Sequence, residues 1–113
     1  MELNELLTFI EKQKDLLQSQ YKNVEESKMT LAMTVKLSEE VGELSQEILG
    51  NLSLVRKEKL NRHNPETLSD EFADVLITTL ILAKKMNVDV KKALESKIDK
   101  LDKRNGLEKD WWR

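Results

Sequence analysis

Apolar residues recur along this chain at the three- and four-residue spacing of amphipathic α-helices. The pattern predicts four main helices, at about residues 2–22, 27–49, 65–87 and 90–105, and a shorter helix with a loop within residues 51–62. The expected buried stripe of the first helix is Leu3, Leu6, Leu7, Ile10 and Leu17, and that of the second is Met33, Leu37, Val41, Leu44 and Ile48. The sequence therefore predicts an all-α fold.

Residues that favour helix ends stand at most of these boundaries. They are Ser27 or Thr30 and Gly50 for the second helix, Asn64-Pro65 for the third, and Asp89 and Gly106 for the fourth. The tail after Gly106 is left unassigned. No internal repeat or low-complexity segment interrupts this order, so we expect residues 1–113 to form a single domain.

Composition supports long helices and excludes several classes of protein. Three glycines and one proline are too few for the turns of an all-β fold, and 35% charged residues, against about 25% on average, suit solvated helices. A net charge of −2 argues against nucleic-acid binding, and the lack of cysteine excludes thiolate metal sites. No signal peptide and no run of ~20 apolar residues is present, so we expect a cytoplasmic protein that does not enter a membrane.

Two acidic clusters lie on the second and third predicted helices. They are Glu39-Glu40-Val41-Gly42-Glu43 and Glu71-Phe72-Ala73-Asp74. Glu40 and Glu43 are three residues apart, as are Glu71 and Asp74, so each pair occupies one helical face. The first pair flanks the apolar stripe of its helix, whereas solvated glutamates usually lie opposite such a stripe. Carboxylates on antiparallel neighbouring helices can converge on one metal ion.

Asp74 is the only charge in the run from Phe72 to Ala83, which reads FADVLITTLILA. We expect a helix that is apolar on nearly every face to be mostly buried, and a buried carboxylate needs a partner. Lys85, the first cation within helical reach, lies far along the helix. A metal ion is therefore the simplest partner, and oxygen ligands alone suit Mg²⁺, with Mn²⁺ as a substitute.

Each acidic residue also has a plainer interpretation. Glu39, Glu40 and Glu43 could form a solvated helix face, and Glu71 could be a first-turn glutamate near the positive end of its helix. A purely structural role suits Asp74 less well, because its surroundings are apolar. The paired arrangement therefore favours a metal site.

Together the clusters resemble the EExxE…ExxD signature of the MazG-like all-α nucleotide pyrophosphohydrolases. EEVGE and EFAD are separated by 27 residues, and the segments KLSEEVGELSQE and LSDEFADVLITTL are similar to the two metal-binding helices of that family. The resemblance covers about residues 27–104. It implies a four-helix-bundle-type, oligomeric fold, with related groups among dimeric dUTPases, dCTP pyrophosphatases and phosphoribosyl-ATP pyrophosphatases.

The resemblance also implies hydrolysis of a nucleoside triphosphate, a deoxy or non-canonical one, to the monophosphate and pyrophosphate, for nucleotide-pool control or housecleaning. The Mg²⁺ ligands that it implies are Glu40, Glu43, Glu71 and Asp74. Glu39 would support the site from outside or orient the attacking water as a catalytic residue. Glu47, one turn beyond Glu43, could assist a second ion or be solvated.

Cations that bind the triphosphate are expected on the fourth predicted helix. Lys97, Lys100 and Arg104 lie along one face, and the first and last of them match the ends of the family's Lys-x-x-x-Asn-x-x-Arg pattern. Leu101 replaces the asparagine, so the pattern does not predict the pyrimidine-type recognition associated with that residue. The alternative is a solvated basic face.

Three aromatic residues have two interpretations each. Trp111 and Trp112 could stack on a nucleobase or pack into a subunit interface or the tail. His63 could be a surface loop residue or contact a base. The sequence does not decide between these roles.

Two other functions stay open beside the pyrophosphohydrolase. One is a non-enzymatic helical interaction module that retains the fold, although all four acids of the metal motif are intact. The other is a phosphoribosyl-ATP pyrophosphatase, which usually has a histidine soon after ExxD, where this chain reads VLITTL. Four helices leave little surface to enclose a nucleotide, and the apolar third helix indicates an interface, so we expect a homodimer or homotetramer.

Overall fold

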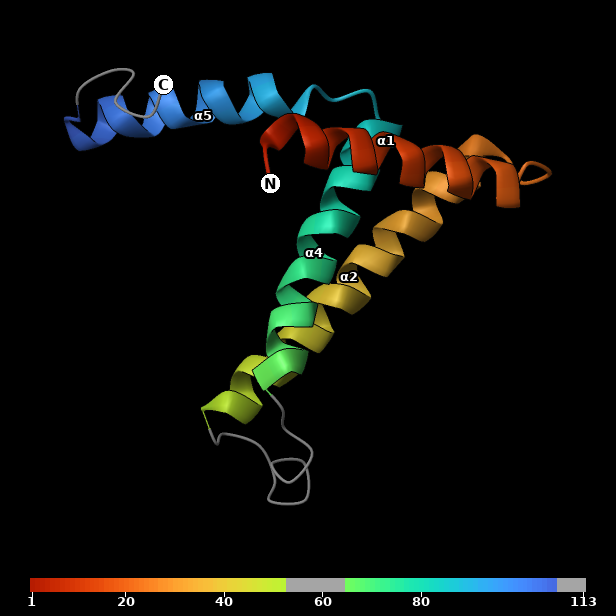
Figure 1. Cartoon of the computed structure of the whole chain (residues 1–113), viewed down its shortest axis with the longest axis horizontal. Helices are drawn as coiled ribbons and strands as arrows, with labels where there is room; N and C mark the ends of the chain where they lie inside the picture. The colour runs from red at the N-terminus through yellow and green to blue at the C-terminus, as the bar shows by residue number, and fades with distance from the viewer. Residues whose placement is uncertain (53–64, 108–113) are drawn as a thin grey trace.

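The computed structural model describes residues 1–52 and 65–107, which contain four α-helices. They are α1 (Leu3–Gln20), α2 (Glu26–Asn51), α4 (Pro65–Lys85) and α5 (Val90–Asn105) (Figure 1). This part of the chain has no strand, which confirms the expected all-α fold. His63, Trp111 and Trp112 lie outside the described residues. The shorter predicted helix also lies outside them, except for its first two residues, where α2 ends. None of the described helices combines the length and apolar content needed to cross a membrane.

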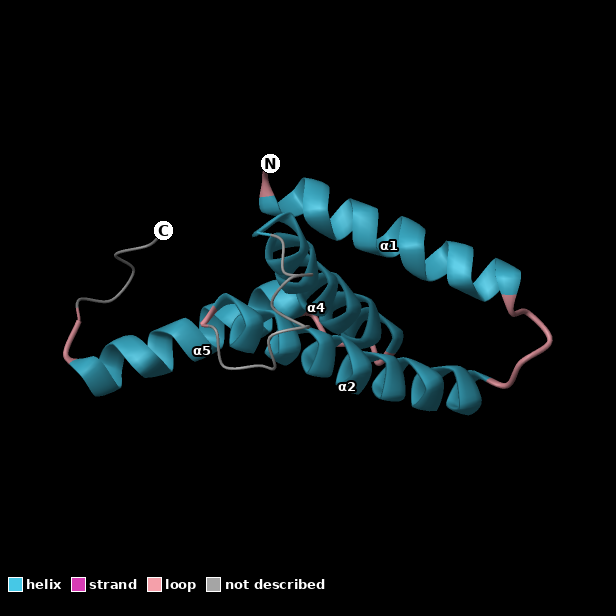
Figure 2. Ribbon diagram, turned by 90° about the horizontal axis from the view of Figure 1, so that it is seen from below, coloured by secondary structure: helices cyan, strands magenta, loops and turns pink. Residues whose placement is uncertain are grey.

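The helices α2 and α4 form an antiparallel pair and pack side by side (Figure 1). The helix α1 crosses one end of this pair, where α2 begins and α4 ends (Figures 1 and 2). Among the described helices α5 contacts only α4, near their junction, and it extends away from the pair. Within residues 1–52 and 65–107, the pair is therefore covered by α1 at one end and has no helical cover at the other.

The core lies where α1 crosses the pair. Ile10 of α1, with 1% of its surface exposed, packs with Met33 of α2 and Ile81 of α4. Partly buried apolar residues surround this cluster, namely Leu6, Leu17, Ile77, Leu80 and Leu82. An ion pair of 2.9 Å between Lys84 Nζ and Glu11 Oε2 also joins α4 to α1. This core occupies the half of the α2/α4 pair nearer to α1, and polar side chains lie between the two helices in the other half.

The limits of α5 follow the local signals in the sequence. Asp89 caps the helix, because its side chain accepts a hydrogen bond of 3.1 Å from the backbone amide of Lys92. Gly106 ends it with a left-handed φ of 71°, which costs glycine no steric strain. Both predicted boundaries are confirmed.

The limits of α2 differ from the prediction. The helix begins at Glu26, after an N-cap at Glu25, and continues through Gly50 to Asn51. Thr30 does not cap it but donates its hydroxyl to the carbonyl of Glu26 at 3.0 Å, a bond that threonine commonly makes inside a helix. The caps predicted at Ser27 or Thr30 and at Gly50 are therefore wrong, whereas the predicted extent of the helix differs from the observed one by only one or two residues at each end.

Candidate metal centre

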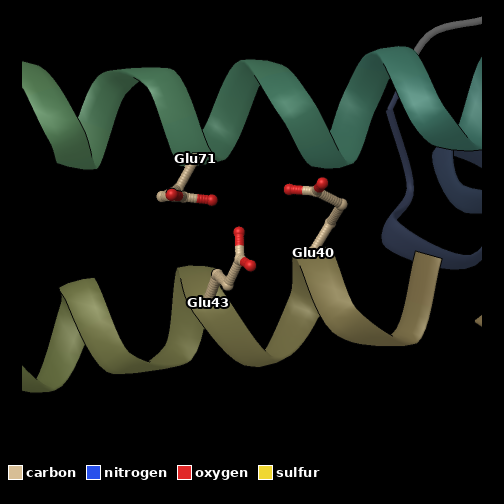
Figure 3. Close-up of side chains that lie close together, drawn as sticks. All are labelled: Glu40, Glu43 and Glu71. Carbon is tan, nitrogen blue, oxygen red and sulfur yellow. The ribbon is translucent and has the colours of Figure 1, made fainter. Parts of the chain in front are cut away.

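Three glutamates converge between α2 and α4, in the half of the pair farther from α1 (Figure 3). Glu40 and Glu43 come from α2, and Glu71 comes from α4. One carboxylate oxygen of each lies within 4.8 Å of those of the other two. Glu40 is buried, Glu71 is partly buried and Glu43 is exposed, so the cluster is accessible to solvent from one side.

Helical spacing explains why Glu40 lies inside. The stripe of α2 that faces α4 passes through Met33, Leu37, Glu40 and Leu44, each three or four residues after the last. Val41, which was expected in this stripe, is exposed instead. The buried stripe of α2 therefore contains Glu40, where the sequence pattern predicted the apolar side chain of Val41.

Mutual repulsion of the carboxylates is visible at Glu71. Its pKa is raised above the ordinary value, first because burial removes water from the carboxyl, and then because Glu43, Asp74 and Glu40 lie near it. A hydrogen bond between the Glu71 and Glu43 side chains adds to the rise. Without a cation, the site therefore favours retention of a proton at Glu71.

The donor set suits a hard divalent cation. Glu40 Oε2 and Glu71 Oε2 are buried and have no hydrogen-bond partner among the described residues. Buried polar atoms are normally satisfied, and an ion would satisfy both of these oxygens. Opposite oxygens around Mg²⁺ lie about 4.2 Å apart, because each Mg–O distance is about 2.1 Å. The three carboxylate oxygens lie within 4.8 Å of one another, so their separations are of the order that one ion requires.

Lys36 is a member of the site that the sequence analysis missed. Its Nζ lies 2.9 Å from Glu40 Oε1, one turn away on α2. That hydrogen bond, together with the charges of Glu40, Glu39 and Glu43, raises the pKa of Lys36. The signal was available in the sequence, because residues four apart on a helix are neighbours. Among the described residues, Lys36 thus forms an ion pair with the buried Glu40.

Comparison with known proteins decides the family. The model of the MazG-like family matches residues 31–112, a segment that holds both acidic clusters. The chain belongs to the MazG-like family. Neither a curated protein nor a solved structure matches it. Family membership confirms the resemblance and suggests a nucleotide pyrophosphatase-type function with a divalent metal.

Asp74 is placed differently from the expectation for this MazG-like chain. It is exposed, and it does not belong to the group of mutually close ligand atoms formed by the other three acids. The prediction that the helix around it is mostly buried is wrong, because among the described helices only α2 and α1 pack extensively against α4, and α5 contacts it little. Asp74 still lies close enough to raise the pKa of Glu71.

The remaining predicted residues lie outside the cluster. Glu39 is exposed beside it on α2, and Glu47 is partly buried further along the same helix. Lys97, Lys100 and Arg104 are all exposed on α5. Glu71 and Lys85 are fourteen positions apart on α4, a length of about 21 Å at the rise of an α-helix, and α5 begins beyond that point. One chain alone therefore does not bring these cations to its own carboxylates.

Proposed function

We propose that this MazG-like protein is a Mg²⁺-dependent nucleoside triphosphate pyrophosphohydrolase that acts on a deoxy or non-canonical nucleotide. The observation that supports it most is the convergence of Glu40, Glu43 and Glu71 from two helices, with buried oxygens that lack hydrogen-bond partners among the described residues. Membership of the family supplies the reaction class. The products are the nucleoside monophosphate and pyrophosphate.

The roles of the residues follow from their positions. Glu40, Glu43 and Glu71 would hold Mg²⁺, and Asp74 would join them by turning its side chain from solvent. Bound Mg²⁺ would neutralise phosphate charge and lower the pKa of a coordinated water. Glu39, exposed at the edge of the cluster, would orient the water that attacks the α-phosphorus. The water oxygen would bond to that phosphorus and release a proton to solvent, while the bond from the phosphorus to the bridging oxygen breaks and pyrophosphate leaves with that oxygen.

The triphosphate needs cations besides the metal. Lys36 lies within the cluster and would exchange its contact with Glu40 for a phosphate oxygen once Mg²⁺ binds that carboxylate. Lys97, Lys100 and Arg104 would bind phosphates from α5, supplied by another subunit because α5 of the same chain extends away. The cytoplasm, where nucleotide pools lie, is the compartment in which we expect this activity.

The direct test is pyrophosphate release from a panel of canonical and modified nucleoside and deoxynucleoside triphosphates, with phosphoribosyl-ATP included. We expect release with Mg²⁺ and none with EDTA. Glu43→Gln should abolish it, since this change removes a ligand charge while keeping nearly the same shape. Glu5→Gln, on α1 and away from the cluster, serves as the control and should keep full activity.

Three outcomes would contradict the proposal in different ways. Turnover of phosphoribosyl-ATP alone would assign the chain to that alternative activity. Mg²⁺ binding without release from any nucleotide would favour a non-enzymatic interaction module. Release that continues in EDTA or in Glu43→Gln would show that the glutamate cluster is not the active site.

A further inference from the structure

The glutamate cluster has a positive charge beside it at Lys36. Its Nζ lies 2.9 Å from Glu40 Oε1, whereas Glu40 Oε2 is buried and has no hydrogen-bond partner among the described residues. Lys36 follows the buried Met33 by three positions and precedes Glu40 by four, so helical spacing places it next to the buried stripe of α2. The ammonium group therefore occupies the same carboxylate that would bind Mg²⁺.

The ion pair between Lys36 and Glu40 does not join two helices. Both residues belong to α2, whereas the ion pair of Lys84 with Glu11 connects α4 to α1. Pairs of opposite charge four residues apart on one helix stabilise that helix only slightly. We therefore expect that Lys36 can change its partner, or be substituted, without loss of the fold.

The two members of the pair differ in their freedom to move. Only 8% of the Glu40 side chain is exposed, because it lies between α2 and α4 with the other two glutamates (Figure 3). In contrast, 53% of the Lys36 side chain is exposed, and a lysine has a flexible four-carbon stem. Lys36 is therefore the member that can leave when another cation arrives.

The charges in the cluster explain why a cation is held there. One carboxylate oxygen each of Glu40, Glu43 and Glu71 lies within 4.8 Å of the others, and like charges at such distances repel one another. Within residues 1–52 and 65–107, no second lysine or arginine forms an ion pair with these three glutamates. Lys36 therefore offsets part of their repulsion.

The same ammonium group opposes the binding of a metal ion. It has hydrogen-bond donors and no acceptor, so it cannot serve as a ligand of Mg²⁺. Next to Glu40 it would instead repel a doubly charged ion. Once the ammonium has moved away, a phosphate oxygen is a suitable new partner, because hydrogen bonds between two charged groups are the strong ones.

We propose that Lys36 is the counter-ion of Glu40 in the metal-free protein and that it transfers its ammonium group to a phosphate of the substrate when Mg²⁺ binds Glu40. This inference rests on the proposed function and deepens it, because it makes the binding of metal and of triphosphate depend on each other. Without nucleotide, Lys36 weakens the binding of Mg²⁺. With nucleotide, the same charge contributes to binding the triphosphate.

Isothermal titration calorimetry of Mg²⁺ into the metal-free full chain, without nucleotide, tests the first half. Lys36→Met should bind Mg²⁺ about 10-fold more tightly than the wild type, because a positive charge beside the ion is removed. Lys36→Gln is the second variant and should do the same. Lys36→Arg keeps the charge and should stay near the wild type.

Lys28→Met is the matched control for these variants. Lys28 is exposed on α2, eight positions before Lys36, which is about 12 Å at the rise of an α-helix. The substitution removes the same charge from beyond the distance of about 10 Å over which salt screens exposed charges. Its affinity for Mg²⁺ should be that of the wild type.

Inorganic tripolyphosphate, titrated into the protein in excess Mg²⁺, tests the second half without turnover and without a choice of base. Lys36→Met should bind it about 10-fold more weakly, since a hydrogen bond between charged groups is lost. The expected result is thus two opposite changes in affinity with unchanged helical circular dichroism. A residue with a merely structural role would weaken the binding of both.

Four results would contradict the proposal. Binding of Mg²⁺ that is unchanged or weaker in Lys36→Met and Lys36→Gln would overturn it, and equal tightening in Lys28→Met would assign the effect to net charge. Unchanged binding of tripolyphosphate would show that Lys36 does not reach the phosphates. A wild type that binds no Mg²⁺ would be a different failure, because it would overturn the proposed function together with the metal site.

Discussion

Asp74 is an exposed carboxylate at the edge of the glutamate cluster, and its substitution tests whether it contributes to binding the metal. It raises the pKa of Glu71 without sharing the close approach of the other three acids. Asp74→Asn keeps the shape and removes one charge. We expect pyrophosphate release to fall by more than about 100-fold, beyond the usual loss for an outer supporting group. Without metal, the melting temperature should stay the same or rise, because repulsion is relieved.

Melting curves with EDTA and with excess Mg²⁺ separate a metal ligand from a structural aspartate. Mg²⁺ binds the folded site, so it should raise the melting temperature of the wild type more than that of Asp74→Asn. Asp70→Asn, one turn earlier on α4 and outside the cluster, is the matched charge control and should behave as wild type. A drop in melting temperature for Asp74→Asn in EDTA would mean that this side chain holds the fold instead.

Glu71 makes the stability of the metal-free protein depend on pH. Its pKa is raised in the folded state, so the folded chain binds this proton more tightly than the unfolded chain does. Below the ordinary value of 4.5 both states are protonated, and the residue has no effect on the free energy of unfolding. As the pH rises from that value through the raised pKa, stability is lost.

Glu71→Gln removes this loss. In EDTA, the variant should match the wild type at low pH, apart from a constant offset, and become the more stable protein as the pH approaches neutrality. Urea unfolding in steps of pH measures the difference. Glu95→Gln on α5, away from the cluster, should track the wild type throughout. A difference that does not change with pH would argue against the charge repulsion inferred at Glu71.

Among the helices, ends that depend on a helix's own residues were predictable from the sequence, whereas the contacts between helices were not. Asp89 and Gly106 end α5 as expected, because a cap and a left-handed glycine act through their own backbone. Thr30 was misplaced because the same hydroxyl can cap a helix or bond back inside it, and packing decides which. Val41 and Asp74 were expected inside, but burial depends on which sides of a helix receive a partner.

The position of α5 carries a prediction of its own. Lys97→Ala and Arg104→Ala should raise KM for the triphosphate about 10-fold or more, since hydrogen bonds to charged groups contribute about 1.5–3 kcal/mol. The increase in melting temperature caused by Mg²⁺ should not change, because neither residue belongs to the group of carboxylates that would hold the ion. Steady-state kinetics at low and high salt should show the difference shrinking as salt screens the contact.

Lys91→Ala is the control for these variants, since Lys91 is exposed at the start of the same helix. It should keep the wild-type KM. If Lys97→Ala and Arg104→Ala also keep it at both salt concentrations, α5 is not the element that binds phosphate. The metal cluster would be unaffected by that result.

For the whole molecule, the sequence was sufficient for the fold class and for most of the cluster. Helical periodicity gave four helices, and the spacing within EEVGE and EFAD brought Glu40, Glu43 and Glu71 to one place. Periodicity does not state how far a pair of helices is covered by the rest of the chain. The separation of α5 from the cluster is a property of that packing, so it had to come from the structure.

The openness of the single chain leads to a prediction about its unfolding. If two copies associate, as expected for this chain, folding is coupled to association, and each tenfold rise in concentration adds about 1.4 kcal/mol per mole of dimer to its stability. The melting temperature should therefore rise by a few degrees over that range. A monomer would instead melt at a temperature that does not depend on concentration, because it unfolds without dissociating. Differential scanning calorimetry at several concentrations measures this, and a transition that stays fixed would show that one chain is stable alone.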